Sequence, residues 1–378
     1  MAGIYIHIPF CNSFCSYCNF YSVKSKRYRE QFVWALKKEA TEKKEYFNKL
    51  GVSPKTIYFG GGTPSVLSLE SLEEILSFVT KEFCVKPLET TIEVNPNDIT
   101  PQFAQGLKGI GFNRVSMGVQ SFIDEHLVWM NRRHRAQGAQ QAYTTLREAG
   151  FENISLDLIF GFEMLSMQQW EYNLEKIIEL SPNHISSYQL SIEPGSALSA
   201  DYSKKRYTPL EDTMCAAQYK KLQQRLSGAG YVQYEISNFA KQENGSISKS
   251  VHNSSYWSKE PYLGLGPAAH SYNGAQRFWN TPSIVKYCKY YNNNEYSEDV
   301  SGIENLTAED IFNESVMLGL RTSEGVNLKC LDNGMVKQIM GEIKAHLSVG
   351  NLVLEGDTIK IPPDKFFVSD GIIKDLFV

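Results

Sequence analysis

The sequence predicts an α/β fold built on parallel strands. Over the first 240 residues, short apolar or alternating runs recur, and most of the gaps between them carry helical patterns. Strands and helices that alternate in units of about 30 residues require parallel strands joined by right-handed crossovers. This alternation is compatible with either a barrel or an open sheet.

The predicted strands are runs in which apolar residues are continuous or alternate with polar ones. They span residues 4–8, 56–59, 90–94, 114–118, 155–160, 184–190 and 233–236. The predicted helices lie between the strands, over residues 28–50, 69–83, 101–108, 138–149, 167–180 and 210–226. Glycine is common at helix C-termini, and the following glycines mark predicted helix ends: Gly51, Gly109, Gly150 and Gly228.

The pattern changes near Thr307, which predicts a second and smaller domain. Two helical patterns are followed by two short strands around the turn at 355–357, and this order indicates a winged-helix-like α+β module. The helices are predicted at 308–320 and 335–349, and the strands at 352–354 and 358–361. The polar segment 241–250 is expected to be a surface loop. The predicted domains are residues 1–236, a linker region at 237–306, and the module at 307–378.

Composition and charge limit the possible functions. The chain has 378 residues, 42% hydrophobic and 21% charged, as in an ordinary soluble globular protein. The net charge of −4 gives no general attraction to nucleic acid or to an anionic membrane, so DNA binding by the C-terminal module is not expected. No apolar stretch is long enough to span a bilayer, and no cationic segment precedes the apolar run at 4–10. A cytoplasmic protein is therefore expected.

Three of the seven cysteines gather in one short segment. Cys11, Cys15 and Cys18 form a CxxxCxxC pattern directly after the first predicted strand. The other four are scattered and have no assigned role: Cys84, Cys215, Cys288 and Cys330. An odd total without a signal peptide argues against a disulfide framework, so the cluster is interpreted as metal ligands or reactive thiols.

Thiolates favour soft metals, which leaves zinc and iron-sulfur clusters as candidates. A structural zinc site normally needs four protein ligands, and a distant histidine would have to complete it here. Three thiolates on a four-iron cluster leave one iron open, which is useful where another molecule binds that iron. The spacing favours a 4Fe-4S cluster that binds a substrate or cofactor.

Residues 5–20 resemble the signature of the radical SAM superfamily, and a Gly60-Gly61-Gly62-Thr63-Pro64 segment follows the second predicted strand. The resemblance implies an incomplete (β/α)6 barrel in which the open iron binds S-adenosyl-L-methionine (SAM), which can be cleaved reductively to a radical. It also implies that Gly61, Gly62 and Thr63 contact SAM. Glycines at a strand end let a ligand approach the backbone closely, although a lone glycine-rich loop is more often a tight turn.

Polar residues interrupt later strands where a packed core favours aliphatic ones. Glu93, Gln120 and Asp157 lie in or directly after predicted strands, and ligands of parallel barrels bind at the carboxyl ends of strands. These three residues, with Arg132 and Tyr5, match SAM-contact positions of the oxygen-independent coproporphyrinogen III oxidase-like group, which the whole chain resembles. Each of them alone could equally be a solvated strand end.

Two features indicate one branch of that group. The oxidase carries a further cysteine where this chain has Phe20, and residues 252–257 match the HNxxYW motif of the haem-chaperone, or HemW-type, branch. An imidazole is a common axial ligand of haem iron, and aromatic faces can pack on the macrocycle. The resemblance therefore implies haem contacts by His252, Tyr256 and Trp257, with His270 as a reserve ligand.

The expected function is haem chaperoning, and the alternative is coproporphyrinogen III oxidation, in which a SAM radical starts oxidative decarboxylation. Enzymatic activity stays open, because Phe20 argues against the oxidase reaction. The expected cofactors are a 4Fe-4S cluster and SAM, with haem as bound cargo. The expected partners are haem, a haem-acceptor protein and an electron donor. A histidine that only hydrogen-bonds the backbone is the plainer interpretation of His252.

Overall fold

The computed structural model describes residues 2–25, 27–243, 245–293 and 301–378. Its central sheet confirms the predicted α/β class, because six strands that follow one another along the chain pair in parallel in that same order. They are β1 (Ala2–Ile8), β2 (Pro54–Gly61), β3 (Glu89–Val94), β4 (Arg114–Gln120), β5 (Asn153–Phe160) and β6 (His184–Gln189). The six predicted runs from 4–8 to 184–190 lie in these strands, except for residue 190, which follows the end of β6.

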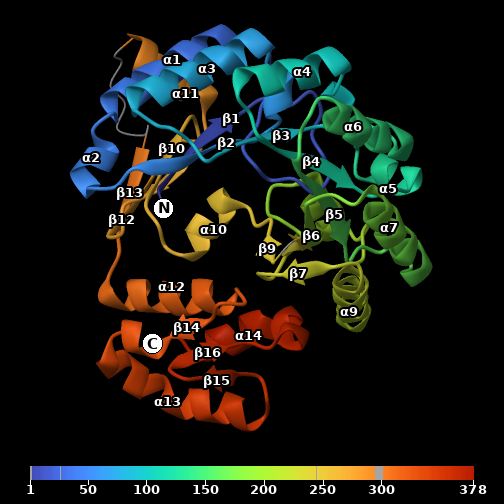
Figure 1. Ribbon diagram of the computed structural model, residues 1–378, viewed down its shortest axis with the longest axis vertical. Helices are drawn as coiled ribbons and strands as arrows, with labels where there is room; N and C mark the ends of the chain where they lie inside the picture. Colours follow the sequence, from blue (N-terminus) through green and yellow to red (C-terminus); the bar gives the residue numbers. More distant parts are fainter. Residues whose placement is uncertain (1, 26, 244, 294–300) are drawn as a thin grey trace.

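Helices cover the outer side of the curved sheet (Figure 1). The long ones are α1 (Arg29–Glu42), α3 (Leu69–Glu82), α4 (Pro101–Ile110), α6 (Ala136–Glu148), α7 (Met167–Leu180) and α9 (Asp212–Gly228). The predicted helix at 28–50 is divided into α1 and α2 (Tyr46–Leu50). The short helices α5 (Asp124–Trp129) and α8 (Ala197–Ser203) were not predicted. Ser166 starts α7 with a capping box, in which its side chain and that of Gln169 each accept a hydrogen bond from the other's backbone N–H.

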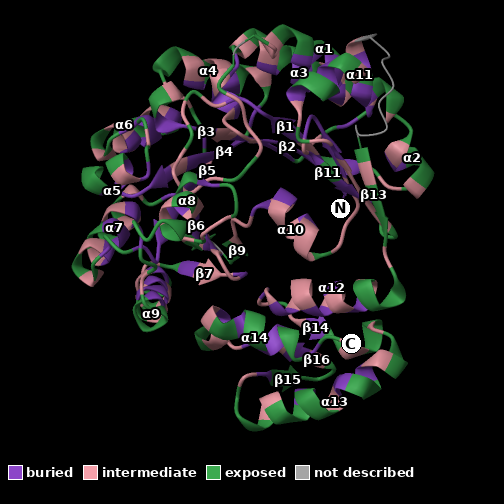
Figure 2. Ribbon diagram, turned by 180° about the vertical axis from the view of Figure 1, so that it is seen from behind, coloured by how far each residue is buried: buried purple, intermediate pink, exposed green. Residues whose placement is uncertain are grey.

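The sheet extends beyond β1 through the region predicted as a linker. Strand β10 (Tyr262–Leu265) pairs in parallel with β1, and three antiparallel strands follow it: β11 (His270–Tyr272), β12 (Gln276–Asn280) and β13 (Ser301–Asn305). Two helices lie in the same region, α10 (Val251–Trp257) and α11 (Ile284–Asn293). Helix α10 lies on the inner side of the sheet, opposite the covering helices (Figures 1 and 2).

At the other edge of the sheet, two expectations are wrong. The run at 233–236 was predicted as a seventh parallel strand, but β7 (Tyr231–Gln233) lies at the edge and pairs antiparallel with β8 (Asn238–Glu243). The segment 241–250 was predicted as a surface loop, but β8 and β9 (Ser246–Ile247) form a hairpin there. The backbone N–H and C=O groups of this segment pair between β8 and β9. The polar side chains of the segment gave no sign of this pairing.

The C-terminal module has the predicted winged-helix-like order. Helix α12 (Ala308–Leu320) precedes β14 (Val326–Asn327), α13 (Asn333–Ser348) and the hairpin of β15 (Val353–Glu355) and β16 (Thr358–Lys360), and the chain ends after α14 (Ser369–Lys374). Strands β14, β16 and β15 form a separate antiparallel sheet. Helix α12 lies nearest to the barrel and contacts α10 (Figure 2).

One face of the parallel sheet is a closely packed apolar layer. The side chains of Ile4, Ile6 and Ile8 in β1 are completely buried, as are Leu156 and Leu158 in β5. Alternate residues of a strand point to the same face, and Tyr5 and Asp157, which lie between these apolar residues, are only partly buried. Among the described residues, no helix is long and apolar enough to cross a membrane.

Candidate functional site

The three clustered cysteines lie in the loop that follows β1 and line a single cavity of about 980 Å³. Cys11, Cys15 and Cys18 are free and partly exposed. The loop is closed by backbone hydrogen bonds between Pro9 and Val23 (2.7 Å) and between Val23 and Cys11 (3.0 Å). The cavity opens at the carboxyl ends of the parallel strands, where ligands of such sheets bind.

The glycine-rich loop after β2 fixes the cysteine loop in place. Gly62 N–H donates to the Ile8 carbonyl (2.9 Å), and Thr63 N–H donates to the Phe10 carbonyl (2.8 Å). A Cβ at Gly62 would lie 2.8 Å from the Phe10 carbonyl oxygen, so only glycine fits there. The Thr63 hydroxyl is 3.3 Å from the Cys11 Sγ. Protein acceptors therefore occupy the N–H groups of Gly62 and Thr63 in this structure.

Two carboxylates line the wall of the same cavity. Glu93 in β3 accepts hydrogen bonds from the Tyr58 hydroxyl (2.8 Å) and from Gly61 N–H (3.2 Å). Burial raises the pKa of Glu93 to about 7 and that of Asp157, in β5, to about 6. The Ser116 hydroxyl is 3.4 Å from Asp157. Each carboxyl group can therefore accept hydrogen bonds when it is ionised and can also donate one when it is protonated.

Arg132 brings a positive charge to the cysteines. Its guanidinium donates to the Cys15 Sγ (3.4 Å) and to the Gly118 carbonyl (2.5 Å). The Gln120 side chain packs over the same glycine, where a Cβ would lie 2.7 Å from Gln120 Nε2. Gln120 has a φ of +67° and lies at a bulge between β4 and β5. This left-handed conformation is uncommon for a residue with a side chain and directs the amide toward the cavity.

The chemistry of this cavity fits an iron-sulfur cluster. Burial raises the pKa of the Cys11 thiol, and that of Cys18 to about 11, so a positive partner is needed to favour the thiolates that bind metal. The Arg132 charge acts in that direction on both thiols. Within the described ranges, no three His, Cys, Asp or Glu side chains are grouped tightly enough to hold a single metal ion.

The cavity brings together most of the residues predicted to contact SAM. It is lined by Gly61, Gly62, Thr63, Glu93, Gln120, Arg132 and Asp157. Tyr5 is the exception, because it lines a second cavity, and its hydroxyl is 3.2 Å from His7 Nδ1.

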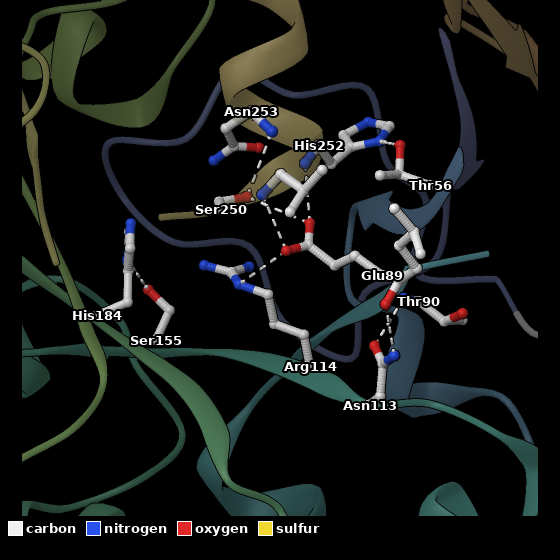
Figure 3. Close-up of polar contacts among 12 residues, drawn as sticks. Thr56, Glu89, Thr90, Asn113, Arg114, Ser155, His184, Ser250, His252 and Asn253 are labelled. Atoms are coloured by element: carbon white, nitrogen blue, oxygen red, sulfur yellow. Dashed lines mark hydrogen bonds and ion pairs between the residues drawn. The ribbon is translucent and has the colours of Figure 1, made fainter. Parts of the chain in front are cut away.

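His252, predicted as a haem ligand in the linker region, is buried in the first turn of α10 (Figure 3). Its Nδ1 is hydrogen-bonded to the Thr56 hydroxyl (2.7 Å) and its Nε2 to the Tyr256 hydroxyl (2.8 Å). The imidazole also stacks on the Tyr58 ring, with centroids 5.0 Å apart. Burial lowers the pKa of His252 to about 3, so the ring is neutral. Neither nitrogen is available to an iron in this conformation.

A buried carboxylate holds the start of α10. Glu89 accepts hydrogen bonds from the N–H groups of Val251 and His252, both at 2.9 Å, and from the Ser250 hydroxyl at 3.4 Å. The buried Arg114 guanidinium lies 3.9 Å from the same carboxylate (Figure 3). Neither Glu89 nor Arg114 was predicted, because a charged residue at the start of a strand gives no signal of a partner distant in the chain, such as α10, about 160 residues after Glu89.

A second cavity, of about 640 Å³, lies beside the first, between the extended sheet and α12. Its wall is rich in aromatic side chains: Tyr5, Phe20, Tyr21, Tyr256, Tyr262 and Tyr272. Asn19, Phe20 and Tyr21 line both cavities. His270, predicted as a reserve haem ligand, lines the second cavity, whereas Trp257 lines neither.

Comparisons with known proteins agree with this geometry. Residues 5–177 match the family described as the Radical SAM superfamily. The protein "Heme chaperone HemW" of Bacillus subtilis is 34% identical over 336 residues, which cover 87% of this chain and 86% of that protein. A protein of the same name from Mycobacterium tuberculosis is 30% identical over 379 residues, which cover 99% of this chain and 94% of that protein.

Among solved structures, the coproporphyrinogen III oxidase (HemN) of Escherichia coli is similar over the whole of this chain and 90% of its own, with a TM-score of 0.83. At 19% sequence identity this similarity shows the fold alone. The two HemW relatives cover most of this chain at 30% identity or more, and its cysteine loop and glycine-rich loop meet at one cavity. The chain therefore belongs to the HemW heme-chaperone family of the radical SAM superfamily.

Proposed function

We propose that this protein is a haem chaperone, which holds a 4Fe-4S cluster and SAM in the cysteine-lined cavity, binds haem, and passes the haem to an acceptor protein. The observation that carries the proposal is the aromatic cavity beside the cysteine-lined one, with residues 19–21 in the wall of both. A planar apolar macrocycle needs such aromatic faces. The names of the HemW relatives support the same function.

In this proposal, Cys11, Cys15 and Cys18 ligate the cluster, and Arg132 offsets the negative charge of their thiolates. When bound, the cluster and SAM supply reductive cleavage of SAM. Glu93 and Asp157 accept hydrogen bonds from the polar groups of SAM, while Gly62 keeps the cysteine loop close to β2. An electron donor and a haem-acceptor protein complete the proposed set of partners.

The second candidate is coproporphyrinogen III oxidation, which the shared fold with the bacterial oxidase favours. Against it, this chain has Phe20 where the oxidase group has a further cysteine. Phe20 is 68% exposed and faces both cavities. An exposed phenyl ring offers a surface for haem but no thiol chemistry.

One anaerobic experiment tests the two candidates together. The purified, cluster-reconstituted chain is mixed with SAM and dithionite and then offered either haem or coproporphyrinogen III. We expect a saturable Soret band with haem and no protoporphyrinogen. Formation of protoporphyrinogen with release of carbon dioxide, and no haem band, would contradict the proposal and assign the oxidase reaction instead.

A further inference from the structure

The second cavity contains a histidine whose ring nitrogens are not used by the fold. His270 is exposed on β11, and its ring stacks on Trp279 of β12 with centroids 5.6 Å apart. Within the described parts of the chain, neither His270 nitrogen has a hydrogen-bond partner. Stacking on Trp279 orients the imidazole without blocking it, which suits an axial ligand.

The other two histidines near this cavity are already occupied. His7 is buried, with Nδ1 3.2 Å from the Tyr5 hydroxyl and Nε2 2.9 Å from the Tyr21 carbonyl. His252 is hydrogen-bonded at both nitrogens, to Thr56 and Tyr256. Either ring would have to break two hydrogen bonds within the fold before it could bind iron.

The size and surface of the cavity suit a porphyrin. A volume of about 640 Å³ lies within the usual range of roughly 300–1,000 Å³ for cofactor sites. Tyr256 and Tyr262 pack edge to face with centroids 4.7 Å apart, and Phe20 presents an exposed ring at the boundary with the cysteine-lined cavity. Aromatic surface of this kind gives a flat macrocycle a large apolar contact area.

The backbone near His270 is also specialised. Ala268 has a φ of +64° and Lys259 a φ of +57°, and both residues line the cavity. Residues with a side chain rarely adopt this conformation, and such strain gathers at ligand sites. Lys259 and Arg277 bring positive charge to the wall, and Glu260 and Glu314 balance it. Recognition therefore depends on aromatic contact and iron ligation more than on net charge.

We propose that this aromatic cavity is the haem site and that the imidazole of His270, rather than that of His252, is the axial ligand to the iron. The proposal rests on the haem-binding function proposed above. It gives Tyr256 the role of a wall residue and gives His252 the role of holding Tyr256 and α10 in place. Haem bound here lies next to residues 19–21, which separate it from the cysteine-lined cavity.

Haem titration of the full chain tests the assignment. Ferric haem is added to the wild type, to His270→Ala, and to the control His346→Ala, whose histidine lies on α13 and pairs with Asp375. We expect the wild type and the control to give the same Soret maximum and affinity. His270→Ala should bind haem at least about tenfold more weakly with a shifted Soret band, and added imidazole should restore the wild-type band.

The outcomes separate this assignment from the function on which it rests. If the wild type gives no saturable Soret band, the haem-binding function itself fails. If the wild type binds haem and His270→Ala keeps the same band and affinity, the assignment is overturned while the function stands. The assignment of His270 is also overturned if His252→Ala loses the Soret band while His270→Ala keeps it, provided that His252→Ala has unchanged circular dichroism and melting temperature. Imidazole rescue distinguishes a lost ligand from a merely misfolded site.

Discussion

At the scale of single residues, burial decides which groups can react. Glu93 and Asp157 lie in the wall of one cavity, and burial raises the pKa of both carboxyl groups toward neutral pH. The Glu93 carboxyl group accepts hydrogen bonds from the Tyr58 hydroxyl and from Gly61 N–H. The same effect acts in the opposite direction on His252, whose pKa falls to about 3, so this imidazole stays neutral.

Replacing Glu93 by glutamine should flatten the pH dependence of stability. Burial raises the pKa of Glu93 to about 7, above the ordinary value of 4.5 expected in the unfolded chain. Between these values the folded chain keeps a proton that the unfolded chain has released, so raising the pH favours unfolding. From pH 5 to pH 8, the wild type should therefore lose unfolding free energy more steeply than Glu93→Gln, as measured by urea unfolding.

The matched control for this experiment is Glu70→Gln. Glu70 lies in the first turn of α3 and is exposed, and hydrogen bonds from its own backbone N–H and from Ser68 lower its pKa. The folded and unfolded chains therefore both lose this proton near or below pH 5, and the Glu70 variant should keep nearly the wild-type slope toward pH 8. Equal slopes for Glu93→Gln and the wild type would show that Glu93 does not carry the proton.

At the scale of elements, α10 links the parallel sheet to the aromatic cavity. Its N-terminus is held by Glu89 of β3, and its His252 is held by Thr56 of β2. One turn later, Tyr256 reaches the wall of the aromatic cavity. Helix α10 also contacts α12, so the motif that resembles a haem-binding sequence positions the cavity wall between the sheet and the C-terminal module.

Substitution of Thr56 by valine should loosen α10. Valine has nearly the same shape as threonine but leaves the buried His252 Nδ1 without a partner, which costs about 1–3 kcal/mol of unfolding free energy. Thr91→Val on the neighbouring strand is the matched control, because the Thr91 hydroxyl is buried with no hydrogen-bond partner in the described structure. Urea unfolding should show no loss, or a gain, for Thr91→Val. Equal effects of the two variants would contradict a docking role of the Thr56 hydroxyl.

Local signals in the sequence predicted the regular elements well. Helix α7 spans the predicted residues 167–180, because Ser166 and Gln169 form a capping box within a few residues of its start. Helix α10, within the region predicted as a linker, was not predicted, and neither was the burial of His252. Its partner Thr56 lies 196 residues away in the chain, so only the folded sheet brings the two together.

At the scale of the whole molecule, the arrangement of the sheet places two cavities side by side. The parallel strands end at the cysteine-lined cavity, and the extension from β10 to β12, with α12, closes the aromatic one. The cysteine spacing and the glycine-rich loop predicted the first cavity. The second cavity is lined by segments that lie between residue 5 and residue 318 of the chain. No local sequence pattern predicts that such distant segments come together. Residues 19–21 are the structural link between the two.

Haem titration with and without the cysteine ligands tests this two-cavity account most directly. The anaerobically reconstituted wild type is compared with a variant that carries Cys11→Ser, Cys15→Ser and Cys18→Ser. Among the residues that the structure describes, no cysteine lines the aromatic cavity. Both proteins should therefore bind one haem per chain with the same Soret maximum, and only the wild type should show iron-sulfur absorption. The account is contradicted if the wild type binds no haem, or if the cysteine variant loses its haem band while remaining folded.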